Sequence, residues 1–221
     1  MRIDIASKQF SDREVLQNLH MQLYPRQVTA LLGPSGIGKS TLLQILAGLD
    51  RDFEGKQLSL PKNIGFCFQE PRLLPWLSVL ENLKLVTKQQ SEIEAMLDQM
   101  GLAGQSQILC HHLSLGMARR VALARALLVH PDILLLDEPF ASLDKPRARQ
   151  LLTLMLASIR QQQCATVIVT HEPTEAVALS DRILILDGTP ATIVRDFPIE
   201  MTEHQRHQPK VVSCVVAQLN L

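Results

Sequence analysis

Residues 33–41 have the sequence Gly33-Pro34-Ser35-Gly36-Ile37-Gly38-Lys39-Ser40-Thr41, which contains the complete pattern G-x-x-x-x-G-K-[ST]. The apolar run 28–32 precedes these nine residues, and the helical pattern 41–47 follows them. In this context, glycines let backbone N–H groups approach phosphates closely, and the helix start adds partial positive charge. We therefore predict that all nine residues bind the phosphates of a nucleotide. Lys39 would reach the β- and γ-phosphates, and the Ser40 hydroxyl would bind Mg²⁺.

Two adjacent carboxylates give a second indication of nucleotide chemistry. The apolar run Ile133 to Leu136 predicts a buried strand, and Asp137 and Glu138 follow it directly. Ligands of open α/β sheets bind at the carboxyl ends of strands. One carboxylate there can hold Mg²⁺, and the other can orient or deprotonate the attacking water. Taken alone, this pair could equally be a solvated strand end.

Other apolar runs predict further strands in a mainly parallel α/β arrangement. The expected strands are 3–6, 28–32, 64–68, 133–136, 166–170 and 182–186. Helical patterns lie between them, at 114–128 and 148–159 among others. The stretch 70–107 contains only helical patterns and turns, so we interpret it as a helical insert. The segment after Pro198 is polar and poor in periodicity, and we expect a tail there.

Bulk composition excludes some classes of protein. The 22 Lys and Arg residues balance 22 Asp and Glu residues, so a basic footprint for nucleic acid is absent and we expect no nucleic-acid partner. The longest apolar runs have the length of strands, far below the roughly 20 residues of a spanning helix. If this protein acts at a membrane, other chains must hold it there.

With these motifs in place, residues 3–197 resemble the nucleotide-binding subunit of ABC transporters. Five features occur in the order of that family: Phe10, Gln69, Leu113-Ser114-Leu115-Gly116-Met117, Ser142-Leu143-Asp144 and His171. They match the adenine-stacking aromatic, the Q-loop glutamine, the signature segment, the D-loop and the switch histidine. The signature segment between the two nucleotide motifs excludes most other phosphate-loop families.

The resemblance implies an α/β phosphate-loop NTPase core with a mainly parallel sheet, a small antiparallel β subdomain and a helical subdomain. The whole chain, 1–221, would be one nucleotide-binding domain, with the helical insert at about 70–128 and a C-terminal tail at 198–221. It also implies ATP and Mg²⁺ as cofactors and a head-to-tail dimer. Each ATP would lie between the phosphate loop of one subunit and Ser114, Leu115 and Gly116 of the other, with Asp144 nearby.

The resemblance also assigns roles to individual side chains. Lys39, Glu138 and His171 would be catalytic, with Glu138 as the base towards water and His171 at the γ-phosphate. Asp137, Gln69 and Ser40 would hold Mg²⁺. The first glycine and the glutamine that the family usually has in its signature are here Leu115 and Met117. We expect the Leu115 side chain to point away from the phosphates and to pack on the helical insert.

The stretch 69–82 narrows the subfamily. It resembles the ATPases of importers for nitrate, sulfonate, taurine and thiamine precursors. Permease subunits would then be partners, with Arg72 to Trp76 as their contact, and a periplasmic or lipid-anchored solute-binding protein would be an indirect one. The chain would lie at the cytoplasmic face of the cell membrane. The alternatives are an exporter ATPase, a non-transport ABC protein and a degenerate nucleotide-binding regulator.

Overall fold

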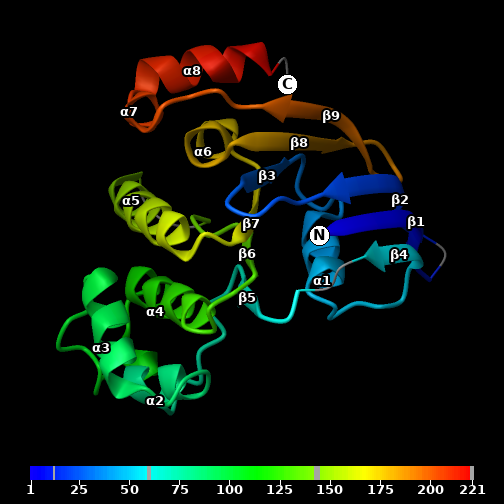
Figure 1. Cartoon of the computed structure of the whole chain (residues 1–221). Coiled ribbons are helices and arrows are strands. Elements are labelled where there is room, and N and C mark those ends of the chain that lie inside the picture. The colour runs from blue at the N-terminus through cyan, green and yellow to red at the C-terminus, as the bar shows by residue number, and fades with distance from the viewer. Residues whose placement is uncertain (12, 59–60, 142–144, 220–221) are drawn as a thin grey trace. The chain divides into compact units, whose positions relative to one another are not determined.

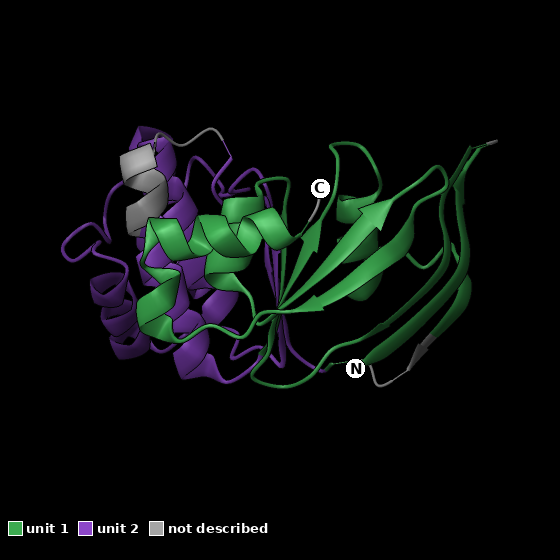
Figure 2. Cartoon of the chain, turned by 90° about the horizontal axis from the view of Figure 1, so that it is seen from above, with its two compact units in different colours: residues 1–61, 165–221 green, residues 62–164 purple. Residues whose placement is uncertain are grey.

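The computed structural model describes residues 1–11, 13–58, 61–141 and 145–219 (Figure 1). The chain forms two compact units, which are coloured separately in Figure 2. Unit 1 comprises residues 1–61 and 165–221, and unit 2 comprises residues 62–164. The chain therefore leaves unit 1 once, through residues 62–164, and returns to it, so residues far apart in sequence share one core.

A small antiparallel sheet forms the first part of unit 1. Its strands are β1 (Arg2–Phe10), β2 (Arg13–Gln22) and β4 (Glu54–Leu58), in the order β2-β1-β4. Ile3 and Ile5 of β1 are buried, as the period of two along a strand requires. This sheet corresponds to the antiparallel subdomain that the resemblance implies.

The second sheet of unit 1 carries the phosphate loop. Its strand β3 (Val28–Leu32) pairs in parallel with β7 (Ala165–Thr170) and β8 (Arg182–Asp187), and β9 (Thr192–Pro198) adds antiparallel to β8. All residues of β3 and β7 are buried, which explains their nearly continuous Val, Ile and Leu content. Helix α1 (Lys39–Leu46) contacts β7, and α6 (Pro173–Leu179) contacts β3 and β7.

The C-terminal segment differs from the tail expected after Pro198. It forms two helices, α7 (Glu203–Arg206) and α8 (Pro209–Gln218), and α8 packs on α6. The Arg206 side chain is buried and donates to the carbonyl of Ser180 and to the carboxylate of Asp181, 2.9 Å away. The segment expected as a polar tail thus contains two helices, of which α7 is a single turn and too short to show periodicity.

Unit 2 combines two parallel strands with several helices. Strand β5 (Ile64–Cys67) pairs with β6 (Ile133–Asp137). Helix α4 (Leu115–Leu127) lies on β5, and Gly65 permits this close packing because a Cβ there would lie 2.3 Å from the Ala126 carbonyl oxygen. The other helices are α2 (Val79–Lys84), α3 (Gln90–Gln99), the 3-10 helix η1 (Cys110–His112) and α5 (Lys145–Gln162).

The loop before α2 is fixed by one buried side chain. Asn82 accepts a hydrogen bond from the backbone N–H of Leu74 and donates to the carbonyls of Leu74 and Ser78. Ser78 caps α2 reciprocally with Glu81, and these contacts to Ser78 lower the pKa of the Glu81 carboxyl. Trp76 is held within this loop with 68% of its surface exposed.

The predicted strands agree with the observed ones to within one or two residues, except for β1, which is longer. Strands β2, β4 and β9 were not predicted. The helices of residues 70–128 lie in unit 2 together with β5, β6 and α5, and a separate helical subdomain stays a prediction. No helix among the described residues is long and apolar enough to span a membrane.

Candidate nucleotide-binding site

The phosphate loop follows β3 and leads into α1. Gly38 precedes the first residue of α1 with φ 110°, a left-handed conformation that glycine adopts without strain. A Cβ at this position would lie 2.8 Å from Val15 Cγ1 and 2.9 Å from Leu16 Cδ2 of the small sheet. The second glycine of the motif is therefore required by both its backbone and its neighbours.

Lys39 is the first residue of α1, and its side chain returns over the loop. Its ammonium donates to the carbonyls of Gly33 and Pro34, each at 2.7 Å, and the residue is only 4% exposed. The loop thus holds a positive charge beside the N–H groups at the start of α1, which together suit a polyphosphate. Ser40 is exposed at the same helix start, and Thr41 is partly buried.

His171 follows the last residue of β7. The Thr170 hydroxyl accepts from the backbone N–H of Glu172 at 3.1 Å and donates to the Glu175 carboxylate at 2.6 Å, so hydrogen bonds brace this turn against α6. His171 Nε2 lies 3.8 Å from the Glu172 carboxylate, and the imidazole is 45% exposed. The turn therefore presents the imidazole outward from a rigid strand end.

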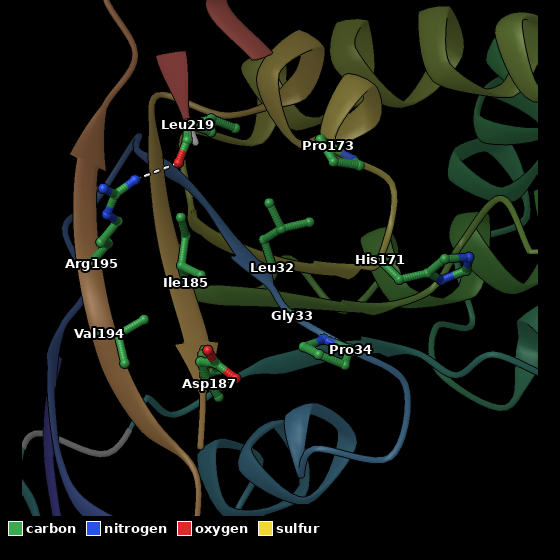
Figure 3. A pocket seen from close by; sticks show the side chains of 11 residues that line it. Leu32, Gly33, Pro34, His171, Pro173, Ile185, Asp187, Val194, Arg195 and Leu219 are labelled. Atoms are coloured by element: carbon green, nitrogen blue, oxygen red, sulfur yellow. Dashed lines mark hydrogen bonds between the residues drawn. The ribbon is translucent and has the colours of Figure 1, made fainter. Parts of the chain in front are cut away.

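A cavity in unit 1 connects His171 with the phosphate loop (Figure 3). Its volume is about 520 Å³, and its lining includes Gly33, Pro34 and His171 together with Ile185 of β8 and Val194 of β9. The structure thus brings His171, the predicted switch histidine, and the start of the phosphate loop to one cavity. Lys39 and Ser40 do not line it, so the cavity reaches only the start of the phosphate loop.

Phe10 ends β1 with 49% of its surface exposed, a fraction that leaves the ring available for stacking. The ammonium of Lys8 lies 4.5 Å from its ring centroid. Sequence reasoning selected Phe10 through the family resemblance and missed Lys8. In the sequence, a lysine two residues before an aromatic residue looks like an ordinary solvated residue of a strand.

In unit 2, the carboxylate pair lies where the sequence predicts it. Asp137 is the last residue of β6 and is 8% exposed, and Glu138 follows with φ 43°. A left-handed glutamate directly before proline is an unusual and costly backbone conformation, of the kind that concentrates at functional sites. Gln69 Nε2 donates to Glu138 Oε2 at 3.3 Å, so the predicted Q-loop glutamine and the predicted base are neighbours.

Two buried groups support this strand end. Arg119 of α4 is 6% exposed and donates to the Pro139 carbonyl at 3.0 Å. Burial lowers the pKa of its guanidinium. Burial also raises the pKa of the Cys67 thiol in β5 to about 11, which keeps the thiol protonated at neutral pH. Cys67 is therefore a packing residue rather than a reactive one.

The signature segment begins α4, as expected. Ser114 is its N-cap and accepts a hydrogen bond from the backbone N–H of Met117 at 3.3 Å. Leu115 lies in the first turn of α4 and is 44% exposed, so any packing on the helical insert covers only part of it. The expected direction of its side chain stays a prediction. Gly116 has open space around it, with no atom within 4 Å of an added Cβ.

The predicted residues divide between the two units. Unit 1 holds Phe10, residues 33–41 and His171, and unit 2 holds Gln69, 114–116, Asp137 and Glu138. Asp144 lies outside the described residues.

A comparison with protein-family models shows the family of the chain. The family model described as "ABC transporter" matches residues 16–141, which is more than half of the 221-residue chain. The chain belongs to the ABC transporter family. The matched range contains the phosphate loop, Gln69, the signature segment and the carboxylate pair of this ABC protein.

Curated relatives are similar over nearly the whole length of the chain. One is "Aliphatic sulfonates import ATP-binding protein SsuB 2" of Pseudomonas syringae pv. tomato, with 39% identity covering 95% of this chain and 92% of the relative. Another is SsuB 1 of Xanthomonas axonopodis pv. citri, with 39% identity covering 94% of this chain and 89% of the relative. The suspected kinship with importer ATPases is confirmed.

A solved structure has the same architecture. It is the dimeric ATP-binding cassette MJ0796 in a post-hydrolysis state bound to ADP and Pi, with a TM-score of 0.77 and 26% identity, covering 91% of this chain and 100% of the other. The predicted fold class is confirmed, and with the family membership this makes the chain an ATP-binding ABC ATPase.

Proposed function

We propose that this chain is the ATP-hydrolysing subunit of a bacterial importer for an aliphatic sulfonate. The evidence for an aliphatic sulfonate as the solute is the 39% identity to an SsuB protein over 95% of the chain. The hydrolytic part rests on the buried Lys39 in the phosphate loop and on the carboxylate pair Asp137 and Glu138 at the end of β6.

In this proposal, the backbone N–H groups of 33–41 and the Lys39 ammonium bind the phosphates of ATP. Phe10 stacks on the adenine. A second copy of the chain supplies Ser114, Leu115 and Gly116 at the start of its α4, and its Asp144 lies nearby. The dimeric state of the similar cassette supports this arrangement.

Mg²⁺ fits the oxygen donors at the strand and helix ends. The described residues contain no cluster of three or more His, Cys, Asp or Glu side chains suited to a metal ion. Mg²⁺ is commonly bound by one or two carboxylates together with substrate phosphates. In this proposal, Asp137 supplies the carboxylate, Ser40 a hydroxyl and Gln69 an amide oxygen. When bound, Mg²⁺ would neutralise charge on the phosphates. Glu138 would accept a proton from the attacking water, and His171 would contact the γ-phosphate.

The membrane partners would be permease subunits, with a solute-binding protein acting through them. The loop 72–76 is our candidate for the permease contact. Trp76 is 68% exposed, although hydrogen bonds between Asn82 and the backbone of Leu74 hold the loop in place. A large exposed aromatic residue on a rigid loop is typical of a protein interface. The chain would then lie peripherally at the cytoplasmic face of the membrane.

Growth on different sulfur sources tests the proposed solute. A strain lacking this gene should fail to grow with an alkanesulfonate as its sole sulfur source and should grow normally with inorganic sulfate. The wild-type gene should restore growth, and the Glu138→Gln variant should not. Normal growth of the deletion strain on alkanesulfonates and on taurine would refute the sulfonate assignment while leaving the ATPase assignment intact.

A further inference from the structure

Lys8 is a buried cation that the nucleotide chemistry above does not use. It is 2% exposed, although it lies on β1 of the small antiparallel sheet. Ile3 and Ile5 face the core, and strict alternation would send residue 8 to the opposite face. The register of β1 shifts between Ile5 and Ser7 against β4, and between Lys8 and Gln9 against β2. The first irregularity precedes Lys8, so it reverses the alternation and turns Lys8 inward.

Two aspartates receive the buried ammonium. Lys8 Nζ lies 2.9 Å from Asp50 Oδ2 and 3.6 Å from Asp52 Oδ2, and it also donates to the Asp52 carbonyl at 2.5 Å. A buried ion pair is weak evidence for stability, because desolvation of both charges offsets their attraction. The contacts that Lys8 makes while held by this ion pair are therefore more informative than the contribution of the pair to stability.

The fixed ammonium faces an aromatic ring. Lys8 Nζ lies 4.5 Å from the ring centroid of Phe10, within the range of a cation–π interaction. The same ring is 49% exposed. The ammonium thus restrains the ring of Phe10 while about half of the residue stays accessible to a second planar group.

The other partner of Lys8 leads to the phosphate loop. The backbone N–H groups of Leu49 and Asp50 both donate to the Gln44 carbonyl in α1, at 2.9 Å and 3.2 Å. Helix α1 begins at Lys39, directly after the loop. A short series of contacts therefore runs from Phe10 through Lys8 and Asp50 to the phosphate-binding helix, all within unit 1.

We infer that Lys8 is a positioning residue that fixes Phe10 against the nucleotide base and at a set distance from the phosphate loop. The inference rests on the proposed stacking of Phe10 on adenine. Since Lys8 acts on the base through Phe10 and, among the described residues, touches no phosphate-binding residue itself, its loss should weaken ATP binding and leave phosphate binding unchanged.

Inorganic tripolyphosphate provides the decisive comparison because it has the phosphates and lacks the base. The Kd of ATP and of tripolyphosphate is measured with Mg²⁺ chelated, so that no hydrolysis occurs. Lys8→Met should raise the Kd of ATP about three- to tenfold and leave the Kd of tripolyphosphate unchanged. Lys8→Arg keeps a cation and should bind ATP nearly as the wild type does. Lys56→Met, which removes an exposed lysine from β4 of the same sheet, is the matched control and should change neither value.

Phe10→Ala distinguishes a failure of the proposed stacking role from a failure of the positioning role of Lys8. If Phe10→Ala leaves the Kd of ATP unchanged, the stacking role in the proposed function is wrong. If Phe10→Ala weakens ATP binding and Lys8→Met does not, or if Lys8→Met weakens tripolyphosphate equally, the positioning role is wrong. In the double variant, Lys8→Met should add little to Phe10→Ala. Should Lys8→Met fail to fold, Asp50→Asn is measured in its place, and equal affinities for ATP in Asp50→Asn and wild type would overturn the inference.

Discussion

The phosphate loop in unit 1 and the signature segment in unit 2 both lie at the start of a helix, but their side chains are placed differently. In the loop, Lys39 is 4% exposed and donates to two carbonyls of its own loop. In the signature segment, Ser114 caps α4 while Leu115 is 44% exposed.

This difference indicates how the two segments act. The phosphate loop has its charged group buried and fixed within its own unit, so it can bind a nucleotide without help from another chain. The signature segment keeps an exposed helix start. This difference agrees with the proposal that the loop binds the nucleotide and that the signature segment acts in the dimer.

The largest effect should come from Glu138, the proposed base, because in our proposal it acts on water and not on nucleotide affinity. Glu138→Gln should lower the ATPase kcat by a factor on the order of 10²–10⁴ with an unchanged Kd for ATP. Steady-state ATPase assays and equilibrium dialysis measure the two quantities. Glu200→Gln, which neutralises an exposed carboxylate, is the control and should behave as wild type. Wild-type turnover in Glu138→Gln would remove the base assignment.

A smaller effect should come from the exposed loop of unit 2. Replacing Arg72 and Trp76 together by alanine should weaken co-purification with the permease several-fold, because removal of an exposed aromatic anchor typically costs about 1–2 kcal/mol. ATP binding by the isolated chain should not change. Replacing the exposed Leu85 by alanine serves as a control for the general loss of apolar surface. Undiminished co-purification would place the permease contact elsewhere.

The smallest effect should come from Leu115. Because its side chain is 44% exposed, Leu115→Gly loses little burial, and its cost is limited to the helix propensity of glycine, at most about 1 kcal/mol. The melting temperature should fall by a few degrees at most, and ATPase activity with the permease should change less than twofold. A sharp rise in turnover would show instead that the leucine obstructs the nucleotide.

The sequence alone predicted the parts of the fold that bury continuous apolar runs. Strands β3, β6 and β7 were placed to within one residue because every residue in them is buried. Strand β9 was missed because it is largely exposed and carries Arg195 and Asp196, which leaves no continuous apolar run. Edge strands of this kind take their conformation from a single neighbour and show little pattern of their own.

The same distinction, between what a buried strand predicts and what packing decides, applies to the residues of the candidate site. Sequence patterns located the phosphate loop and the carboxylate pair, and the family resemblance located His171; each lies at or directly after the end of a buried strand. The burial of Lys8 depends on register shifts within the small sheet, and the exposure of Leu115 depends on where α4 lies on β5. Both are properties of packing between elements distant in sequence, which periodicity cannot report.

Nucleotide-dependent dimerisation tests the division between the two segments most directly. In the Glu138→Gln background, analytical ultracentrifugation with ATP should show a dimer that reverts to monomer when ATP is removed. Adding Ser114→Arg should abolish this dimer while equilibrium dialysis shows monomers that still bind ATP with unchanged affinity. Adding Lys39→Ala instead should abolish both the dimer and the binding. The account would be contradicted if Ser114→Arg weakened ATP binding by the monomer as much as Lys39→Ala does, or if the dimer formed despite Ser114→Arg.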